Sequence, residues 1–206
     1  PVVIDESANI RVAARRIAWG KWLNAGQTCV APDYILVNEK VRQPFLDELG
    51  TAITDFFGAD PHTSESYGRV VSPRHFDRLK SLINGGKVVI GGETNADDRY
   101  ISPTVLTDVD VNSALMNEEI FGPLLPVLSV TSTRQAIDFI TARPHPLALY
   151  VFAENKSVVN EVLTRTTAGG VTVNGTLMHL TSPHLPFGGI GESGMGGYHG
   201  KSGVRL

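Results

Sequence analysis

The stretch PVLSVTSTRQAIDFITARPHPLALYVFAENKSVVNEVLTRTTAGGVTVN (residues 126–174) alternates short apolar runs with segments in which apolar residues recur at helical spacing. The expected strands are residues 126–130, 147–153 and 169–174, and the expected helices are residues 132–142 and 155–165. Strands that are apolar along their whole length are typical of a parallel sheet covered on both faces. The stretch therefore predicts an α/β fold, with a mostly parallel open sheet and helices on both faces.

The residues before this stretch continue the same pattern. Helical spacing follows Asp5 and returns over residues 45–57, while residues 34–37 and 87–91 are short apolar runs typical of strands. Ser72 is followed by a proline, which is typical of a helix start because Ser caps the first turn and Pro fits within it. The whole chain therefore fits one α/β unit.

The carboxyl-terminal segment differs from the rest. Seven glycines lie between Gly188 and Gly200, which predicts irregular backbone that lies on or between neighbouring elements. Within it, Gly189, Gly191 and Gly194 match the G-x-G-x-x-G pattern of dinucleotide-binding loops. That pattern binds phosphate only between a strand and a helix, and the flanking prolines and glycines argue against both. We therefore reject it as a phosphate site.

Composition limits the classes of function. With 206 residues, 42% of them hydrophobic and 19% charged, the chain is ordinary for a folded protein and long enough to bury a core. A net charge of −3 with scattered basic residues argues against a nucleic-acid partner. No apolar run reaches the ~18 residues of a membrane span. A single cysteine and the lack of an export signal favour the cytoplasm.

NAGQTCV (residues 24–30) contains Cys29, the only cysteine in the sequence. A single sulfur can form neither an internal disulfide nor a multi-thiolate metal site, and we predict no metal centre. Cys29 is therefore either a small buried hydrophobe, the more common case for a lone cytosolic cysteine, or a reactive thiol. Its small polar neighbours would allow a backbone N–H to stabilise an oxyanion. One functional alternative is a cysteine hydrolase or thioesterase in which one of six histidines activates the thiol.

NEEIFGPLLPV (residues 117–127) places two acids, an aromatic ring and a Gly-Pro turn directly before an expected strand. A carboxylate in such a place can bind ribose hydroxyls, and a ring can pack beside a flat heterocycle. The alternative is purely structural, with a solvated acid pair and Phe121 anchored in the core. The residues alone leave both interpretations open.

Three segments taken together resemble the aldehyde dehydrogenase superfamily. They are NAGQTC (24–29), EEIFGP (118–123) and LPFGGIGESGMGGYHGKSG (185–203), in the order in which the family has them. The wording VNGTLMHLTSPHLPFGG (173–189) is similar to the class 3 branch, which acts on fatty and aromatic aldehydes. The resemblance runs along the entire chain.

The resemblance implies roles for particular residues. Cys29 matches the nucleophile, whose thiolate attacks an aldehyde to form a thiohemiacetal; hydride then passes to NAD or NADP, and a thioester is hydrolysed. The backbone N–H of Cys29 would be one oxyanion donor. Glu119 matches the acid that holds the nicotinamide ribose, and Phe121 the ring beside it. The residues implied near the substrate channel are Asn24, Asn174 and Phe187.

Several parts of the family pattern would precede Pro1. They are the general base, a glutamate in an ELGGK-type stretch, the nucleotide-binding Rossmann domain, a second oxyanion donor and much of the oligomerisation hairpin. The chain also opens without Met and within an apolar run. We therefore expect residues 1–206 to be a single catalytic domain excised from a longer chain, with the domain that binds most of the NAD or NADP absent.

This expectation extends to activity and partners. Glu118 and Glu192 are the nearest substitutes for the base, but neither matches a base position. We expect the fragment to be inactive and the full-length protein to be an active homo-oligomer that acts on a small-molecule aldehyde. The alternatives are the cysteine hydrolase and a non-catalytic remnant that associates through its former domain interface. Which aldehyde is oxidised, NAD or NADP preference, oligomeric state and any membrane anchor stay open.

Overall fold

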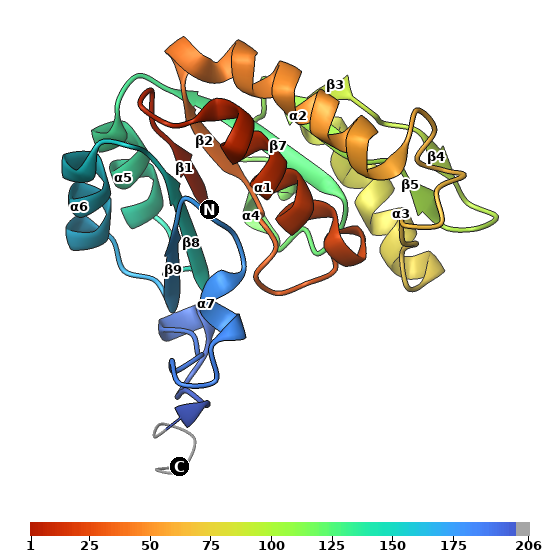
Figure 1. Cartoon of the computed structure of the whole chain (residues 1–206). Helices are drawn as coiled ribbons and strands as arrows, with labels where there is room; N and C mark the ends of the chain where they lie inside the picture. The colour runs from red at the N-terminus through yellow and green to blue at the C-terminus, as the bar shows by residue number, and fades with distance from the viewer. Residues whose placement is uncertain (201–206) are drawn as a thin grey trace.

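The computed structural model describes residues 1–200, and a mostly parallel β-sheet of seven strands lies at their centre (Figure 1). In sheet order the strands are β3 (Lys87–Ile90), β6 (Thr104–Thr107), β7 (Leu124–Val130), β2 (Ile35–Asn38), β1 (Val2–Ile4), β8 (Ala148–Phe152) and β9 (Gly170–Val173). Neighbouring strands run parallel except at the β3 edge, where β3 pairs antiparallel with β6. The predicted fold class is confirmed.

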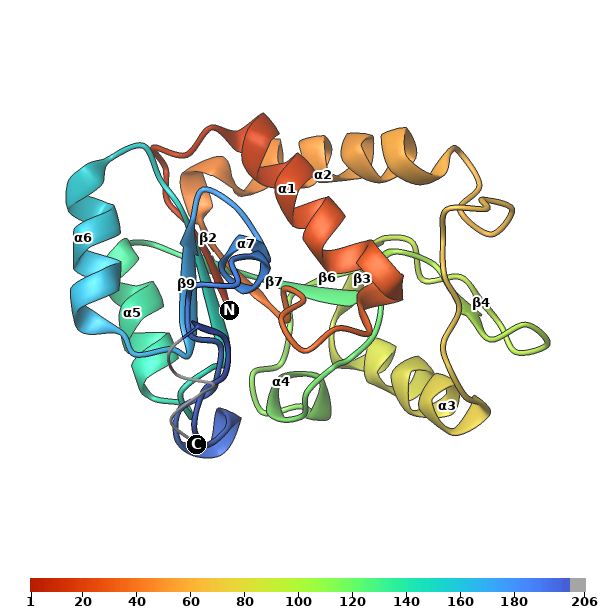
Figure 2. The same ribbon diagram turned by 60° about the horizontal axis from the view of Figure 1, so that its bottom comes forward.

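Two helices cover one face of this sheet. Helices α1 (Ile10–Trp22) and α2 (Arg42–Phe57) lie side by side across it (Figures 1 and 2). Because side chains alternate along a strand, Ile4 points to this face and packs in one buried cluster with Ile17 and Phe45. The two helices therefore form one layer, in which α1 carries the chain toward Cys29.

The opposite face is covered by α3 (Pro73–Leu82), α5 (Thr133–Thr141) and α6 (Lys156–Arg165). Val3, the strand neighbour of Ile4, packs on this face with Ile137 and Val162. Leu79 of α3 packs with Leu124 of β7 in a separate buried cluster. The continuous apolar strands of the sequence are thus explained by burial on both sides.

Side-chain caps set the starts of four helices. The side chains of Asn9, Ser72, Ser132 and Asn155 each accept a hydrogen bond from a backbone N–H in the first turn of α1, α3, α5 and α6, respectively. Each cap satisfies a donor that the helix itself leaves unpaired. The start of α3, predicted from Ser72 and the following proline, is confirmed.

The sequence patterns did not indicate every element. Strand β6 and the small hairpin of β4 (Thr94–Asn95) and β5 (Tyr100–Ile101) were not predicted, and neither were the short helices α4 (Ala114–Asn117) and α7 (Met178–Thr181). Strands of two to four residues are too short for a period-2 pattern to be recognised. Strand β7 also begins two residues earlier than predicted, at Leu124.

The glycine-rich tail extends away from the sheet in Figure 1 as irregular backbone that closes on itself. Phe187 and Tyr198 form an isolated antiparallel bridge within it. Residues 201–203 of the segment LPFGGIGESGMGGYHGKSG (185–203) lie outside the described residues.

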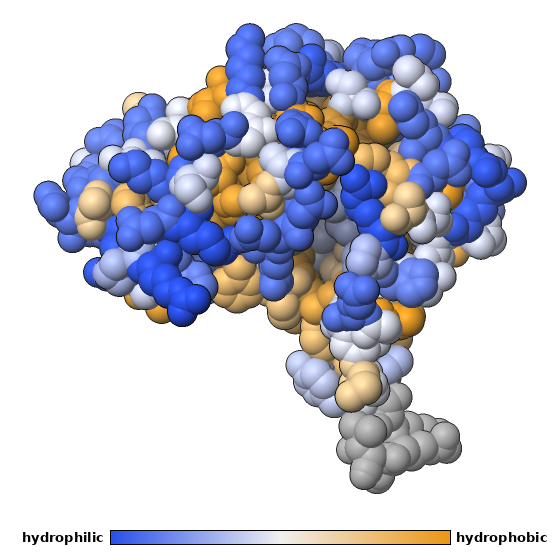
Figure 3. Space-filling view, turned by 180° about the vertical axis from the view of Figure 1, so that it is seen from behind, coloured by the Kyte–Doolittle hydropathy of each residue, from blue (hydrophilic) through white to orange (hydrophobic). Residues whose placement is uncertain are grey.

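Seen from behind, apolar side chains gather in the middle of the molecule between polar flanks (Figure 3). Within residues 1–200, no helix has both the length and the apolarity needed to cross a bilayer.

Candidate active site

A cleft of about 480 Å³ brings together residues that are ninety positions apart in the sequence. Cys29, Glu119 and Phe121 all line it, together with Pro1 and Ala148. Pro1, the Cys29 loop, the EEIFGP turn and the residues before β8 all precede their strands, so the cleft lies at the amino ends of β1, β2, β7 and β8. Ligands in open α/β sheets are usually bound at the carboxyl ends. Fold rules alone would therefore have placed the site at the wrong edge.

Cys29 is exposed in this cleft, so the buried-hydrophobe interpretation is wrong. Three consecutive residues before it, Asn24, Ala25 and Gly26, have left-handed backbone with φ of 54°, 53° and 74°. Non-glycine residues adopt this region at a free-energy cost, which is typical of functional loops. The loop turns the chain sharply between α1 and β2 and leaves the thiol at the surface.

Close packing holds this loop from the side of the EEIFGP turn. A Cβ built on Gly26 would lie 2.6 Å from the carbonyl carbon of Gly122, so only glycine fits there. Beyond Cys29, the hydroxyl of Tyr150 donates a 2.6 Å hydrogen bond to the carbonyl of Val30. Burial raises the pKa of Tyr150 well above its ordinary value of 10, so this hydroxyl stays a donor.

The acidic segment is held by a residue that the sequence did not single out, Arg78 of α3. Its guanidinium donates to the carbonyl oxygens of Glu119 at 3.2 Å and Ile120 at 2.5 Å, and it lies 3.4 Å from the carboxylate of Glu118. Hydrogen bonds from a charged donor are stronger than neutral ones. Arg78 thus fixes the backbone from which the Glu119 side chain projects.

Phe121 is not the core anchor of this segment. Phe121 is 40% exposed and lines the cleft, whereas Ile120 beside it is fully buried against α3 and β7. Phe121 also has a positive φ of 47°, which turns the chain after the buried Ile120. The purely structural interpretation of Phe121 is therefore wrong, and the ring is available to a ligand.

Two charged groups, one that lines the cleft and one that is buried, were also missed by sequence reasoning. Asp33 lines the cleft and accepts a hydrogen bond from the backbone N–H of Ile120 at 3.2 Å. Lys21 of α1 is fully buried; burial lowers its pKa from 10.5 to about 8, although Asp33 acts in the opposite direction. Partial burial, and secondly Asp33, raise the pKa of Glu119, and Arg78 opposes this. Lys21 was recognised only as a helix position because its periodicity matches that of apolar residues.

The other expected site residues lie elsewhere. Asn174 follows β9 at the opposite, carboxyl edge of the sheet, where its side chain exchanges two 2.9 Å hydrogen bonds with the backbone of Ala153. Phe187 is half-buried between His179 and Tyr198. Asn24 is exposed in the Cys29 loop and donates to the carbonyl of Gln27. None of the three predicted channel residues lines the cleft within the described part of the chain.

The candidate general bases differ in position. Glu192 lines the cleft with Cys29, whereas Glu118 pairs with Arg78 outside it. No histidine among residues 1–200 lines the cleft. A cysteine hydrolase needs an imidazole within hydrogen-bond reach of the thiol. The cleft therefore gives no support to the hydrolase alternative.

The fold and this cleft define a class of protein. Residues 1–205 match the model of the aldehyde dehydrogenase family, and the chain belongs to that family. It is 50% identical over 201 residues to the dimeric NADP-preferring aldehyde dehydrogenase of Rattus norvegicus. The matched residues make up 98% of this chain and 44% of that relative. It is 51% identical over 203 residues to the 4,4'-diaponeurosporen-aldehyde dehydrogenase of Staphylococcus aureus, and the matched residues make up 98% of this chain and 44% of that relative.

Solved structures agree with these relatives. The substrate-bound state of AldH from Staphylococcus aureus superposes with a TM-score of 0.96 at 49% identity and covers all of this chain and 45% of that one. The NAD-dependent aldehyde dehydrogenase of Sinorhizobium meliloti gives a TM-score of 0.90 at 26% identity, and the match covers all of this chain and 42% of that one. The chain thus spans less than half the length of each of these four proteins.

Proposed function

We propose that this chain carries the catalytic thiol of a NAD(P)-dependent aldehyde dehydrogenase, which oxidises an aldehyde to a carboxylic acid. The observation that carries the proposal is the meeting of Cys29, Glu119 and Phe121 in one cleft. The same three residues were assigned to nucleophile and cofactor contacts by resemblance. The names of the relatives support the reaction class.

The first chemical step falls to Cys29. Its thiolate attacks the aldehyde carbon, a C–S bond forms, and the carbonyl oxygen takes the negative charge of a thiohemiacetal. The backbone N–H of Cys29 supports this step, because no acceptor for it is found among the described residues. A free N–H beside the attacked carbon can donate to the developing oxyanion.

The cleft also fits one end of a nicotinamide cofactor. Glu119 offers an exposed carboxylate for ribose hydroxyls, and the exposed ring of Phe121 offers an apolar surface beside it. When bound, NAD(P)⁺ supplies the acceptor for the hydride that leaves the thiohemiacetal carbon. Arg78 holds the backbone of Glu119 and Ile120, so this surface is preformed. We propose that the remaining cofactor contacts come from a domain outside residues 1–206.

Hydrolysis of the thioester on Cys29 requires a base to activate water. Glu192 is the carboxylate in the cleft, but it does not match the family's base, which we expect to precede Pro1. Loss of a general base typically lowers a rate by ~10²–10⁴-fold. We therefore propose that residues 1–206 alone have no measurable dehydrogenase activity.

Two expressed proteins test this proposal: residues 1–206 and the full-length protein that contains them. With an aldehyde and NAD⁺ or NADP⁺, the full-length protein should form NAD(P)H, seen by absorbance, and the fragment should not. Cys29→Ser in the full-length protein should abolish the reaction. Turnover by the fragment would contradict its proposed inactivity, and turnover by Cys29→Ser would contradict the assignment of the nucleophile.

We also propose partners and a location for the full-length protein. The apolar area in Figure 3 supports association of the full-length protein as a homo-oligomer, because such areas are usually covered by protein. The cytoplasm is proposed from the single cysteine. Sedimentation of the full-length protein tests the first proposal, and fractionation of cells tests the second.

A further inference from the structure

The Cys29 loop is tied to the rest of the molecule through Gln27, which does not line the cleft. Gln27, two residues before the thiol, uses its amide as a clamp on a neighbouring segment, Tyr67–Val71, which we call the strap. Its Nε2 donates to the carbonyl of Arg69 at 3.0 Å, and its Oε1 accepts from the backbone N–H of Val71 at 2.9 Å. The same Nε2 donates to the carbonyl of Asn24 at 3.1 Å.

These bonds reach both ends of the left-handed turn. The carbonyl of Asn24, the first left-handed residue, receives both the side chain and the backbone N–H of Gln27 at 3.1 Å. The side chain of Asn24 returns a 3.1 Å bond to the carbonyl of Gln27. A Cβ built on Gly68 of the strap would lie 3.5 Å from the Cβ of Ala25, the second left-handed residue, so the two segments pass close to each other there. A backbone with unfavourable φ persists only when its surroundings hold it, and Gln27 connects it to a support.

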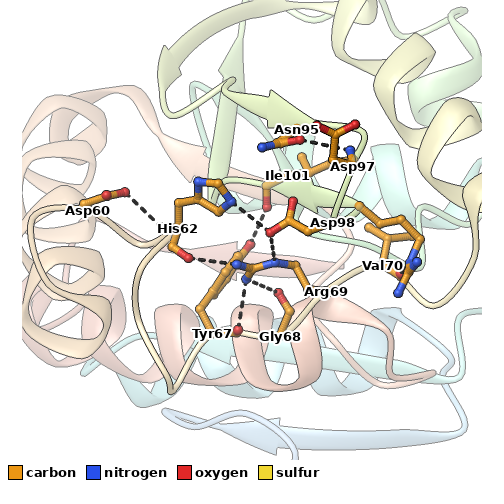
Figure 4. Close-up of polar contacts among 11 residues, drawn as sticks. Asp60, His62, Tyr67, Gly68, Arg69, Val70, Asn95, Asp97, Asp98 and Ile101 are labelled. Carbon is orange, nitrogen blue, oxygen red and sulfur yellow. Dashed lines mark hydrogen bonds and ion pairs between the residues drawn. The ribbon is translucent and has the colours of Figure 1, made fainter.

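The strap is itself rigidly held by a charged cluster (Figure 4). Arg69 donates from Nε to Asp98 Oδ2 at 2.8 Å and from a terminal nitrogen to the carbonyl of His62 at 2.7 Å. The same Asp98 oxygen lies 2.8 Å from Nε2 of His62, whose ring stacks on Tyr100 at 4.3 Å between centroids. The strap is thus fixed to the β4–β5 hairpin rather than to the cleft.

Backbone contacts and burial add to this hold. Val70 is buried in the cluster beneath α3, its N–H donates to the carbonyl of Arg99 at 3.2 Å, and its carbonyl accepts from the Arg99 side chain at 2.9 Å. The hydroxyl of Tyr67 donates to the carbonyl of Ile101 at 2.8 Å. Side-chain and backbone hydrogen bonds therefore hold the strap in place along its length.

We propose that Gln27 is a positioning residue for the Cys29 thiol, and that it acts by holding the left-handed turn against the strap that Arg69 and Asp98 fix. This inference rests on the proposed function, because it assigns Gln27 to the reaction at Cys29. Gln27 does not line the cleft, and we therefore assign it a positioning role and not a catalytic one. Its loss should misplace the nucleophile while leaving the binding surface of Glu119 and Phe121 intact.

The test uses the full-length protein and four variants. Gln27→Ala removes the clamp. Gln43→Ala is the matched control, because the side chain of the exposed Gln43 on α2 bonds to Asp47 of its own helix and to no other residue among residues 1–200. Arg69→Lys keeps a charge toward Asp98 but loses the fork that also reaches His62. Cys29→Ser defines the background. For each protein we measure KM and kcat, with kcat expressed per titrated active site. Each folded protein that keeps Cys29 is also treated with iodoacetamide, and the alkylated fraction of Cys29 is followed over time on the peptide that contains it.

Gln27→Ala should lower kcat per active site by 10-fold or more with KM for NAD(P)⁺ within about twofold, since a misplacement near 1 Å can cost ~10²-fold. Its alkylation rate should change as well, while Gln43→Ala should match the parent in every measurement. A merely structural role would lower the fraction of active protein without changing kcat per site. Equal kcat per site and equal alkylation in the two glutamine variants would overturn the proposal.

Arg69→Lys and Cys29→Ser provide two further tests of the proposal. If Gln27→Ala does not fold, the comparison passes to Arg69→Lys, which leaves the Gln27 bonds to the strap backbone available. A lower kcat per site with unchanged KM supports the proposal there, and unchanged kcat overturns it. If Cys29→Ser retains turnover, the proposed function fails. If Cys29→Ser is inactive but Gln27→Ala keeps the kcat per site and the alkylation rate of the parent, the positioning role alone fails.

Discussion

Gly26 offers a sharp test of how the Cys29 loop is packed, through the substitution Gly26→Ala. The new Cβ would lie 2.6 Å from the carbonyl carbon of Gly122, whereas carbon atoms in contact are about 3.5 Å apart or more. The Cys29 loop and the EEIFGP turn must therefore separate by about 1 Å. A left-handed alanine adds about 1–2 kcal/mol of backbone cost, because φ here is +74°.

The separation acts on both sides of the cleft, because one segment carries Cys29 and the other carries Glu119 and Phe121. A displacement of about 1 Å can lower catalytic rates by ~10²-fold. We therefore expect Gly26→Ala in the full-length protein to lower kcat/KM by about 10- to 100-fold. The assay is NAD(P)H formation at saturating and limiting aldehyde, with urea unfolding measured in parallel.

Gly58→Ala is the matched control for this prediction. Gly58 also has a positive φ, +82°, but a Cβ built there has nothing within 4 Å. Alanine at Gly58 should cost about 1–3 kcal/mol of stability from backbone strain alone and leave kcat/KM near that of the parent. Equal losses of kcat/KM in the two variants would refute the reasoning, because stability and not the loop contact would then explain them.

Two more predictions concern buried and bridging charges. Lys21 has a pKa near 8 in the folded protein and 10.5 in the unfolded chain. Between pH 8 and pH 10.5 the unfolded chain therefore binds one proton more than the folded protein, and the free energy of unfolding should rise with pH across this window by about 3 kcal/mol. Lys21→Met should remove that rise, and urea unfolding at pH 7.5 and pH 10 would show parallel changes in the two proteins if the argument were wrong. Arg78→Ala should raise KM for NAD(P)⁺ by about 10-fold, because two charged hydrogen bonds beneath Glu119 are lost. Arg134→Ala, which removes an exposed pair with Asp138, serves as its control and should leave KM unchanged.

The outcome for Phe121 shows where sequence reasoning was limited. The EEIFGP wording does not say which of its two apolar side chains faces the core, because both Ile and Phe are commonly buried. The structure answers this by packing Ile120 beneath α3 and turning the chain at Phe121. Asn174 shows the opposite limit, since a residue expected near the channel instead ties β9 to Ala153 at the far edge of the sheet.

Sequence alone was sufficient for the alternation of strands and helices, the helix start at Ser72 and the three segments that mark the family. These features are local, because periodicity, capping and motif wording depend on residues a few positions apart. Only the tertiary structure decided that the candidate site lies at the amino ends of four strands, that Cys29 is exposed there, that Gln27 and Arg78 hold the segments on which it is built, and that Lys21 is buried. Each of these depends on segments that are distant in the chain and meet only when the sheet has brought them together, so no local pattern encodes them.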